Sequence, residues 1–477
     1  MSRSHRSGAH AAQPSGISRR GLLGATTAVA AGVGLGASGL GASGPGAAPA
    51  SAAPGTAPFV RAPSVPGWTD GFHFGAATSG FQAEGFNPDS NWRRYTDRAA
   101  RTGRVDPVRN SVDFRHRYRA DLHLAAGMGL NTFRFGIEWA RVEPQRGRFS
   151  AAALAYYDDL VADIRSLGMS PMITLVHYVY PGWVADQGGF LGARTLGDFE
   201  RYARMITARY AEQCSMWISI NEPLVFYGHE KEIGALTDAD MPRFLDRIAH
   251  AHRIAHTAAH DANPQARVAV NEAFLPAVTP VTDALFMNRV VDTLDFIGID
   301  YYYGAALNNL TTIAAAGGDF AAVRPQPDDI YQACHHYAQA FPGKPLYIIE
   351  NGMPLSDGAP RADGYTRANF LRDSLFWLQR ARGDGLPIVG YNHWSITDNY
   401  EWGSYTTRFG LYRVDVLRDP GLTRHPTSGV DAYRELTAGA GPAANYRPVM
   451  DPAVGSFARI PQSWIMPSRV DGPRAQL

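Results

Sequence analysis

Two glutamates that follow short apolar runs have side chains suited to paired acid chemistry. Glu222 lies in the tripeptide Asn221-Glu222-Pro223, and Glu350 begins the tripeptide Glu350-Asn351-Gly352. Two facing carboxyl groups can cleave an acetal, because one protonates the departing oxygen while the other supports or attacks the developing oxocarbenium-like carbon. A separation of about 5–5.5 Å retains configuration, and about 6.5–9.5 Å admits a water molecule and inverts it. Each glutamate taken alone is also explained as a carboxylate that caps a loop.

Eight apolar runs alternate with helical patterns from residue 71 onward, which indicates βα units and a parallel sheet. The predicted strands are Phe72–Thr78, Thr132–Ile137, Pro171–His177, Trp217–Asn221, Arg267–Asn271, Phe296–Tyr302, Leu346–Glu350 and Ile388–Ser395. The predicted helices include Asp113–Gly129, Ala151–Gly168, Asp198–Cys214, Pro242–Ala262, Asp328–Ala340 and Tyr365–Arg382. Eight such units are the number that closes a (β/α)8 barrel, so the sequence predicts an α/β fold with a single TIM barrel.

Polar or aromatic residues stand where nearly every predicted strand ends. They are Thr78, Glu138, His177, Glu222, Asn271, Tyr302, Glu350 and Trp394. In a TIM barrel this end of the strands carries the active site. The fourth and seventh strands lie nearly across the barrel from each other, so we expect Glu222 and Glu350 to face one another.

The two ends of the chain differ in composition from its middle. Ser18-Arg19-Arg20-Gly21 precedes a stretch rich in Ala, Gly, Leu and Val, and Ala50-Ser51-Ala52 offers a small-residue cleavage site. This order resembles a twin-arginine export signal, with a membrane anchor as the alternative. We therefore expect residues 1–55 to be a signal peptide and linker, 56–438 the catalytic domain, and 439–477 a Pro-rich tail. The expected location is outside the cell or in its envelope, without stable membrane insertion after processing.

Composition excludes several classes of function. The chain has 45 Lys and Arg against 44 Asp and Glu, so no excess of charge favours binding to nucleic acid. Its two cysteines are too few for a disulfide scaffold or a cysteine-based zinc finger. His252, His256 and His260 recur every fourth residue like metal ligands on a helix. An ordinary outer helix is the favoured interpretation, so we expect no metal and no cofactor.

Five segments resemble, in order, the signatures of glycoside hydrolase family 1, the β-glucosidase family of retaining enzymes. They are Phe72–Gly85, Arg134–Pro144, Trp217–Pro223, Ile349–Gly352 and Gly390–Trp402, within a resemblance from Asp70 to about Glu435. The resemblance implies that Glu350 is the nucleophile and that Glu222 is the general acid and later the general base. It also implies that Tyr302 donates a hydrogen bond to Glu350 and that Arg134 lies beside it as a counter-charge.

The resemblance further implies a set of side chains that bind the sugar. Hydroxyl groups of the sugar would be bound by Gln82, His177 and Glu401, with Asn221 at the 2-hydroxyl. Trp394 would form the apolar floor under the ring, and Trp402 would donate from its indole N–H. Packing at the top of the barrel is the alternative for the two tryptophans. Glu401-Trp402 is similar to family members that act on unphosphorylated sugars.

Two departures from the family pattern bear on the substrate. Asp300 stands where the family typically has Asn, and the segment from Asn271 to Asp295 is several tens of residues shorter than usual. We therefore expect an open or differently built leaving-group side. The predicted function is an exported retaining exo-β-glycosidase that cleaves an unphosphorylated β-glycoside through a glycosyl-enzyme intermediate. A transglycosidase and a non-catalytic sugar-binding protein are the alternatives, and the presence of both glutamates argues against the latter. The sequence specifies neither the sugar nor the oligomeric state.

Overall fold

The computed structural model describes residues 71–314 and 320–459. The signal peptide and linker expected in residues 1–55 lie outside this part of the chain. Among the helices of the described residues, none combines the length and the apolar character that crossing a membrane requires.

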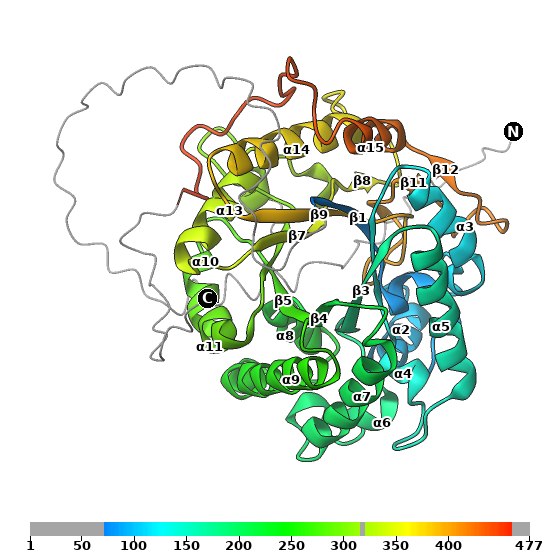
Figure 1. Ribbon diagram of the computed structural model, residues 1–477. Coiled ribbons are helices and arrows are strands. Elements are labelled where there is room, and N and C mark those ends of the chain that lie inside the picture. Colours follow the sequence, from blue (N-terminus) through cyan, green and yellow to red (C-terminus); the bar gives the residue numbers. More distant parts are fainter. Residues whose placement is uncertain (1–70, 315–319, 460–477) are drawn as a thin grey trace, which may run out of the picture.

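Eight parallel strands close into a barrel in the order β1-β2-β3-β4-β5-β6-β7-β9 (Figure 1). Their bounds are β1 (His73–Ala77), β2 (Thr132–Gly136), β3 (Ser170–Val176), β4 (Met216–Asn221), β5 (Arg267–Ala273), β6 (Ile297–Tyr301), β7 (Leu346–Asn351) and β9 (Ile388–Trp394). Pairing of β1 with β9 closes the cylinder. The predicted TIM barrel is confirmed, and each predicted strand lies within two residues of an observed one.

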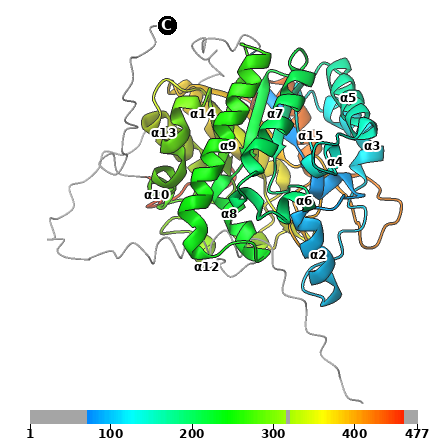
Figure 2. The same cartoon turned by 90° about the horizontal axis from the view of Figure 1, so that it is seen from below.

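The long helices form a ring outside the barrel, as Figures 1 and 2 show. They are α3 (Phe114–Ala126), α5 (Ala151–Ser166), α7 (Thr195–Tyr210), α9 (Met241–Ala262), α13 (Asp329–Ala340), α14 (Arg367–Gly383) and α15 (Ser428–Ala438). Ser150 caps α5 by accepting a hydrogen bond from the Ala153 N–H at 3.2 Å. Gly168 follows the end of α5 with φ of 77°, a conformation that glycine adopts without strain.

The remaining elements lie in the connections between the strands and the helices of the ring. The helical ones are η1 (Gly80–Glu84), α2 (Asn91–Arg101), α4 (Trp139–Val142), α6 (Gly182–Ala185), η2 (Gly189–Leu191), α8 (Pro223–Glu232), η3 (Asp238–Asp240), α10 (Thr279–Thr282), η4 (Asp283–Met287), α11 (Asn288–Val290), η5 (Val291–Thr293), α12 (Thr311–Ala314) and η7 (Phe320–Ala322). Two-residue strands form two small sheets, β8 (Leu355–Ser356) with β10 (Thr407–Arg408) and β11 (Tyr412–Arg413) with β12 (His425–Pro426). The connection between β5 and β6 consists of short helical turns, from α10 to η5, and the loops that flank them.

The barrel strands are buried on both faces, because side chains fill the interior and helices cover the outside. Every residue of β2, β4, β6, β7 and β9 is buried. Strands buried in this way read as nearly continuous apolar runs, which is why they could be located from the sequence. Cys214 and Cys334 are both buried free thiols, and burial raises the pKa of Cys214 to about 12.

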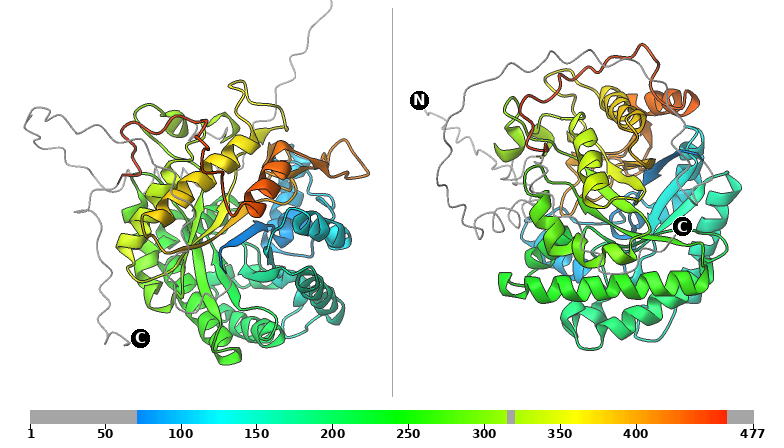
Figure 3. Two further views of the ribbon diagram at one scale, coloured as in Figure 1. Left: turned by 45° about the horizontal axis from the view of Figure 1, so that its top comes forward. Right: turned by 60° about the vertical axis from the view of Figure 1, so that its left-hand side comes forward.

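The described part of the C-terminal tail packs along the outside of α14 and α13 (Figure 3). The Asp373 carboxylate on α14 accepts hydrogen bonds from the Tyr446 hydroxyl at 2.5 Å and from the Met450 N–H at 2.9 Å. Ser456 donates from its hydroxyl to Asp329 on α13 at 2.6 Å. Residues 439–459 are thus attached to the outer helices of the barrel by polar contacts. The sequence alone does not determine whether this segment packs on the barrel.

Candidate active site

Glu222 and Glu350 both lie at the carboxyl end of the barrel. Glu350 is the penultimate residue of β7, and Glu222 immediately follows β4. Glu222 adopts φ of 36°, and this left-handed conformation turns the chain from β4 directly into α8. Both side chains are almost completely buried, with 7% of Glu222 and 3% of Glu350 exposed. Buried carboxyl groups require partners, and the neighbouring strands supply them.

Arg134 on β2 connects the Glu350 carboxylate to Asn221. Its Nη1 forms an ion pair with Glu350 Oε1, and its Nη2 donates to Asn221 Oδ1 at 2.5 Å. A third bond runs from Arg134 Nε to the Thr174 hydroxyl on β3 at 3.0 Å. Because this arginine is fully buried, its charge has no solvent to stabilise it and is balanced inside the site.

Tyr302 completes the hydrogen bonding of Glu350. Its hydroxyl donates to Glu350 Oε2 at 2.6 Å, so each carboxylate oxygen is bound by a different residue. A hydrogen bond to an ionised group is roughly twice as strong as one between neutral groups. The side chain of Glu350 is thus held in one orientation from two sides, by the two residues that the family resemblance implies, Arg134 and Tyr302.

Tyr178 binds Glu222 and was not predicted as a site residue. Its hydroxyl donates to Glu222 Oε2 and accepts from Asn221 Nδ2 at 2.7 Å. Asn221 Nδ2 also lies 3.4 Å from Glu222 Oε2. Burial, followed by the charges of Glu222 and Glu350, raises the pKa of Tyr178 well above its usual value. One chain of hydrogen bonds therefore connects Glu350 to Glu222 through Arg134 and Asn221.

Asp300 on β6 adds a third carboxyl group to this end of the barrel. It is paired with Glu350 in the register of β6 and β7, and its Oδ2 accepts a hydrogen bond from Asn271 Nδ2. Asn271 also donates to Asn221 Oδ1 at 2.7 Å. Burial raises the pKa of Asp300 well above its usual value, and the charges of Glu350 and Glu222 raise it further. These effects favour the neutral carboxylic acid.

Gln82, Glu401 and Trp394 form a second polar cluster at the same end. Trp394 donates from Nε1 to Glu401 Oε1 at 2.8 Å, and Gln82 Nε2 lies 3.3 Å from Glu401 Oε2. Gln82 also donates to Asn399 Oδ1 at 3.1 Å. These residues come from the turn η1, the end of β9 and the loop after it, so three segments meet here.

His177 packs between the two tryptophans and Tyr178, whose ring centroid lies 4.8 Å from its own. Its ring stacks on Trp394, with centroids 5.7 Å apart, and on Trp402, with centroids 5.9 Å apart. Tyr178 also packs against Trp402, at 5.0 Å between ring centroids. Burial, followed by the charge of Arg134, lowers the pKa of His177 well below its usual value, which favours the neutral ring. The structure thus brings all ten predicted site residues to one end of the barrel.

A buried network supports the turn that carries Gln82. Arg141 Nε donates to Glu84 Oε2 at 2.7 Å, and the Tyr157 hydroxyl donates to Glu84 Oε1 at 2.8 Å. Glu138 lies next to this network, and its side chain is almost entirely buried. Burial, together with the charge of Glu84, raises the pKa of Glu138 to about 8.

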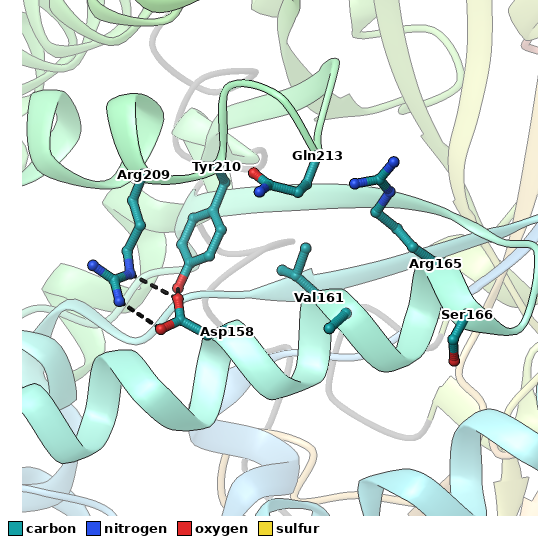
Figure 4. A pocket seen from close by; sticks show the side chains of 8 residues that line it. Asp158, Val161, Arg165, Ser166, Arg209, Tyr210 and Gln213 are labelled. Carbon is teal, nitrogen blue, oxygen red and sulfur yellow. Dashed lines mark hydrogen bonds and ion pairs between the residues drawn. The ribbon is translucent and has the colours of Figure 1, made fainter.

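A groove of about 850 Å³ lies elsewhere, between α5 and α7 on the outer ring (Figure 4). In it, Arg209 forms an ion pair with Asp158 at 2.5 Å, and the Tyr210 hydroxyl donates to Asp158 at 3.1 Å. None of the predicted site residues lines this groove, so it is separate from the candidate active site.

Sequence comparison with known proteins points to one family of enzymes. The sequence model of glycosyl hydrolase family 1 matches residues 66–274 and 264–441. Beta-glucosidase 7 of Arabidopsis thaliana is 28% identical over 449 residues, which cover 76% of this chain and 88% of that protein. Coniferin beta-glucosidase of Pinus contorta is 26% identical over 470 residues, which cover 76% of this chain and 91% of that protein.

Solved structures share the barrel. The apo structure of a beta-glucosidase numbered 1317 aligns with a TM-score of 0.65 and 26% identity, covering 78% of this chain and all of that one (100%). A beta-glucosidase from Thermotoga maritima in complex with azafagomine also aligns with a TM-score of 0.65, at 21% identity, over 78% of this chain and 99% of that one. At that level of identity, the second likeness concerns the fold.

Proposed function

The chain belongs to glycosyl hydrolase family 1 and is a β-glucosidase-like glycosidase, and from this we propose that it removes single unphosphorylated β-glycosyl units with retention of configuration. The observation that carries the proposal is the different environment of the two glutamates. Both oxygens of Glu350 are bound, by Arg134 and Tyr302, whereas Glu222 is bound by Tyr178 and Asn221.

In the first step, Glu350 acts as the nucleophile and Glu222 as the acid. A bond forms between a Glu350 carboxylate oxygen and the anomeric carbon while the bond from that carbon to the leaving oxygen breaks. The proton of Glu222 passes to the leaving oxygen, which departs as an alcohol. Arg134 and Tyr302 orient the attacking carboxylate and stabilise its negative charge before attack.

In the second step, Glu222 acts as a base toward water. The water oxygen bonds to the anomeric carbon, the ester bond to Glu350 breaks, and the water proton passes to Glu222. Tyr178 stabilises the ionised Glu222 during this step, because its hydroxyl donates to Oε2. Two displacements at one carbon give net retention.

The remaining predicted side chains are assigned to the sugar. Gln82, His177 and Glu401 are proposed to bind hydroxyl groups, and Trp394 is proposed to lie under the ring. Their support is proximity, since hydrogen bonds and stacked rings join them into one cluster. Asn221 is proposed to bind the 2-hydroxyl, and Trp402 to donate from its indole nitrogen. The absence of a phosphate on the sugar is proposed from the pair Glu401-Trp402.

Export through residues 1–55 is part of the same proposal and is supported by the order of paired arginines, apolar stretch and small residues. Mass spectrometry of the mature N-terminus after expression in a host with an intact twin-arginine pathway tests it. We expect cleavage after residue 52 or close to it, and recovery of the full-length chain in the cytosol of a competent host would contradict it.

A panel of nitrophenyl glycosides, followed by NMR detection of the first anomer released, tests the reaction. We expect hydrolysis of at least one β-glycoside with the β-anomer formed first. An α-anomer formed first would contradict the nucleophile role of Glu350. Products that carry the glycosyl unit on an added alcohol, formed faster than free sugar, would favour the transglycosidase alternative.

A further inference from the structure

Two histidines of α9 and one aspartate form a cluster at the end of the barrel opposite to the glutamates. His260 Nε2 lies 2.8 Å from Asp295 Oδ2, and His256 Nε2 lies 3.9 Å from Asp295 Oδ1. Asp295 precedes β6, and its Oδ2 also accepts a hydrogen bond from the N–H of Val268, near the start of β5. The cluster therefore lies where the strands begin, on the inner side of α9, the long helix in Figures 2 and 3.

The third histidine of the sequence pattern is not part of this cluster. His252 is fully buried, its Nδ1 is 2.8 Å from the Ser219 hydroxyl, and its Nε2 is 3.1 Å from the Thr293 carbonyl oxygen. Both of its ring nitrogens are thus used within the fold. The third member of the cluster is therefore Asp295, whereas the spacing along the helix indicates His252. Asp295 lies outside the helix, so the pattern of histidines could not indicate it.

We propose that His256, His260 and Asp295 bind one divalent first-row transition metal ion, for which Zn²⁺ is the appropriate probe. Two imidazoles four residues apart lie on one face of a helix and can chelate one ion. Imidazole together with a carboxylate suits zinc, nickel or copper, whereas magnesium and calcium prefer oxygen ligands alone. Water would occupy the remaining coordination positions.

The three side chains are close enough for this role. Their ligand atoms all lie within 4.8 Å of one another, and ligands at about 2.0–2.2 Å from zinc can be no more than about 4 Å apart. A small rotation of His256 closes this difference. Its imidazole forms no hydrogen bond with the residues that the structure describes, and 23% of its side chain is exposed. Asp295, in contrast, is already held in one orientation by the Val268 N–H. Ligands of metal ions are usually oriented by such an outer hydrogen-bond partner.

An ion pair between His260 and Asp295 explains only part of the cluster. It leaves His256 unused, although the His256 ring packs against that of His260 with centroids 4.3 Å apart and His256 Nε2 lies 3.9 Å from Asp295 Oδ1. Among the described residues, neither nearby cation forms an ion pair with Asp295 within 4 Å. Arg253 forms an ion pair with Asp292 at 3.1 Å, and Lys344 donates to the Leu294 carbonyl oxygen at 2.6 Å. A bound cation would use all three side chains at once.

Such an ion would join α9 to the segment that leads into β6. It would tie together parts of the chain about 35 residues apart in sequence, and it would favour the folded state over the unfolded one. Because the cluster and the glutamates lie at opposite ends of the strands, we expect the ion to raise the melting temperature and to leave kcat/KM unchanged. The inference is independent of the proposed reaction.

The test uses the full chain with any purification tag removed, treated with EDTA and dialysed. Zn²⁺ is titrated by isothermal calorimetry, and thermal unfolding is followed with Zn²⁺, with Mg²⁺ and with EDTA. We expect one zinc ion per chain, a dissociation constant in the micromolar range, and a rise of several degrees in melting temperature with Zn²⁺ alone. His256→Ala should weaken binding at least tenfold and abolish the rise. His250→Ala, an exposed histidine on the same helix, is the matched control and should retain both.

Three results would overturn the inference. The first is no zinc binding by the unaltered protein below millimolar concentration. The second is equal zinc binding by His256→Ala and the unaltered protein. The third is loss of binding in His250→Ala as large as in His256→Ala. His260→Gln is the second variant if His256→Ala unfolds, with the same expected loss of zinc binding.

Discussion

Replacement of Glu138 by Gln tests the electrostatics under the turn that carries Gln82. The Glu138 side chain is almost entirely buried, and burial together with the charge of Glu84 raises its pKa to about 8 from an ordinary value of 4.5. The folded protein then binds a proton on Glu138 at pH values where the unfolded chain has lost it. Its contribution to stability is fully present below pH 4.5 and is lost as the pH rises toward 8.

The expected size follows from this shift. Each pKa unit corresponds to about 1.4 kcal/mol, so the change from 4.5 to about 8 removes on the order of 5 kcal/mol from the wild-type protein between these two pH values. Gln has nearly the same shape as Glu and does not titrate. An unfolding entropy of about 2.1 cal/mol/K per residue makes 5 kcal/mol equal to roughly 6 °C for a barrel of this size.

Thermal unfolding of the wild-type protein and Glu138→Gln is compared at several pH values between 4.5 and 8. We expect the melting temperature of the variant, relative to wild type, to rise steadily with pH by several degrees in total. Glu200→Gln, a half-exposed glutamate on α7, serves as the control and should show no such trend. A difference that does not change with pH, or that falls as the pH rises, would refute the reasoning.

Three further substitutions test the site itself. Glu222→Ala should lower kcat/KM by about 10²- to 10⁴-fold on substrates with poor leaving groups and far less on activated ones, with partial rescue by azide; an equal loss on all substrates would contradict an acid role. Tyr178→Phe removes a hydrogen bond to Glu222 that is worth about 1.5–3 kcal/mol, so kcat/KM should fall by roughly 10- to 100-fold, while Tyr180→Phe, whose hydroxyl binds Glu230, should stay near wild type. Asp300→Asn can keep the contact with Asn271 but cannot ionise. Because burial raises the pKa of Asp300, the stability of the variant relative to wild type should grow as the pH rises from 4. A constant difference in melting temperature would argue against a neutral Asp300.

Much of the fold could be predicted from local sequence, for a physical reason. Strands buried on both faces need continuous apolar runs, and polar residues at their ends are tolerated only where partners exist. The strand ends at Glu222 and Glu350 therefore carried information about the barrel and about its functional end. The helix caps at Ser150 and Gly168 are likewise local features, because each depends on one residue and its neighbours.

Contacts that depend on three-dimensional register could not be predicted in this way. Tyr178 contacts Glu222 because of its left-handed backbone conformation, with φ of 64°, and because of the register in which β3 pairs with β4. Neither feature is evident from the sequence near residue 178. Asn271 and Asp300 meet because their strands β5 and β6 pair. Asp295 joins His260 from a segment 35 residues further along the chain. The course of residues 439–459 depends on hydrogen bonds that this segment donates to two buried aspartates, Asp329 of α13 and Asp373 of α14.

The central claim is that Glu350 attacks the anomeric carbon, and a mechanism-based inactivator tests it most directly. The protein is incubated with a 2-deoxy-2-fluoro-β-glycoside of a sugar that it hydrolyses and is then digested for peptide mass spectrometry. The account predicts one label per chain, attached to Glu350. A label on Glu222 or Asp300, or no label on a protein that hydrolyses the parent glycoside, would contradict it.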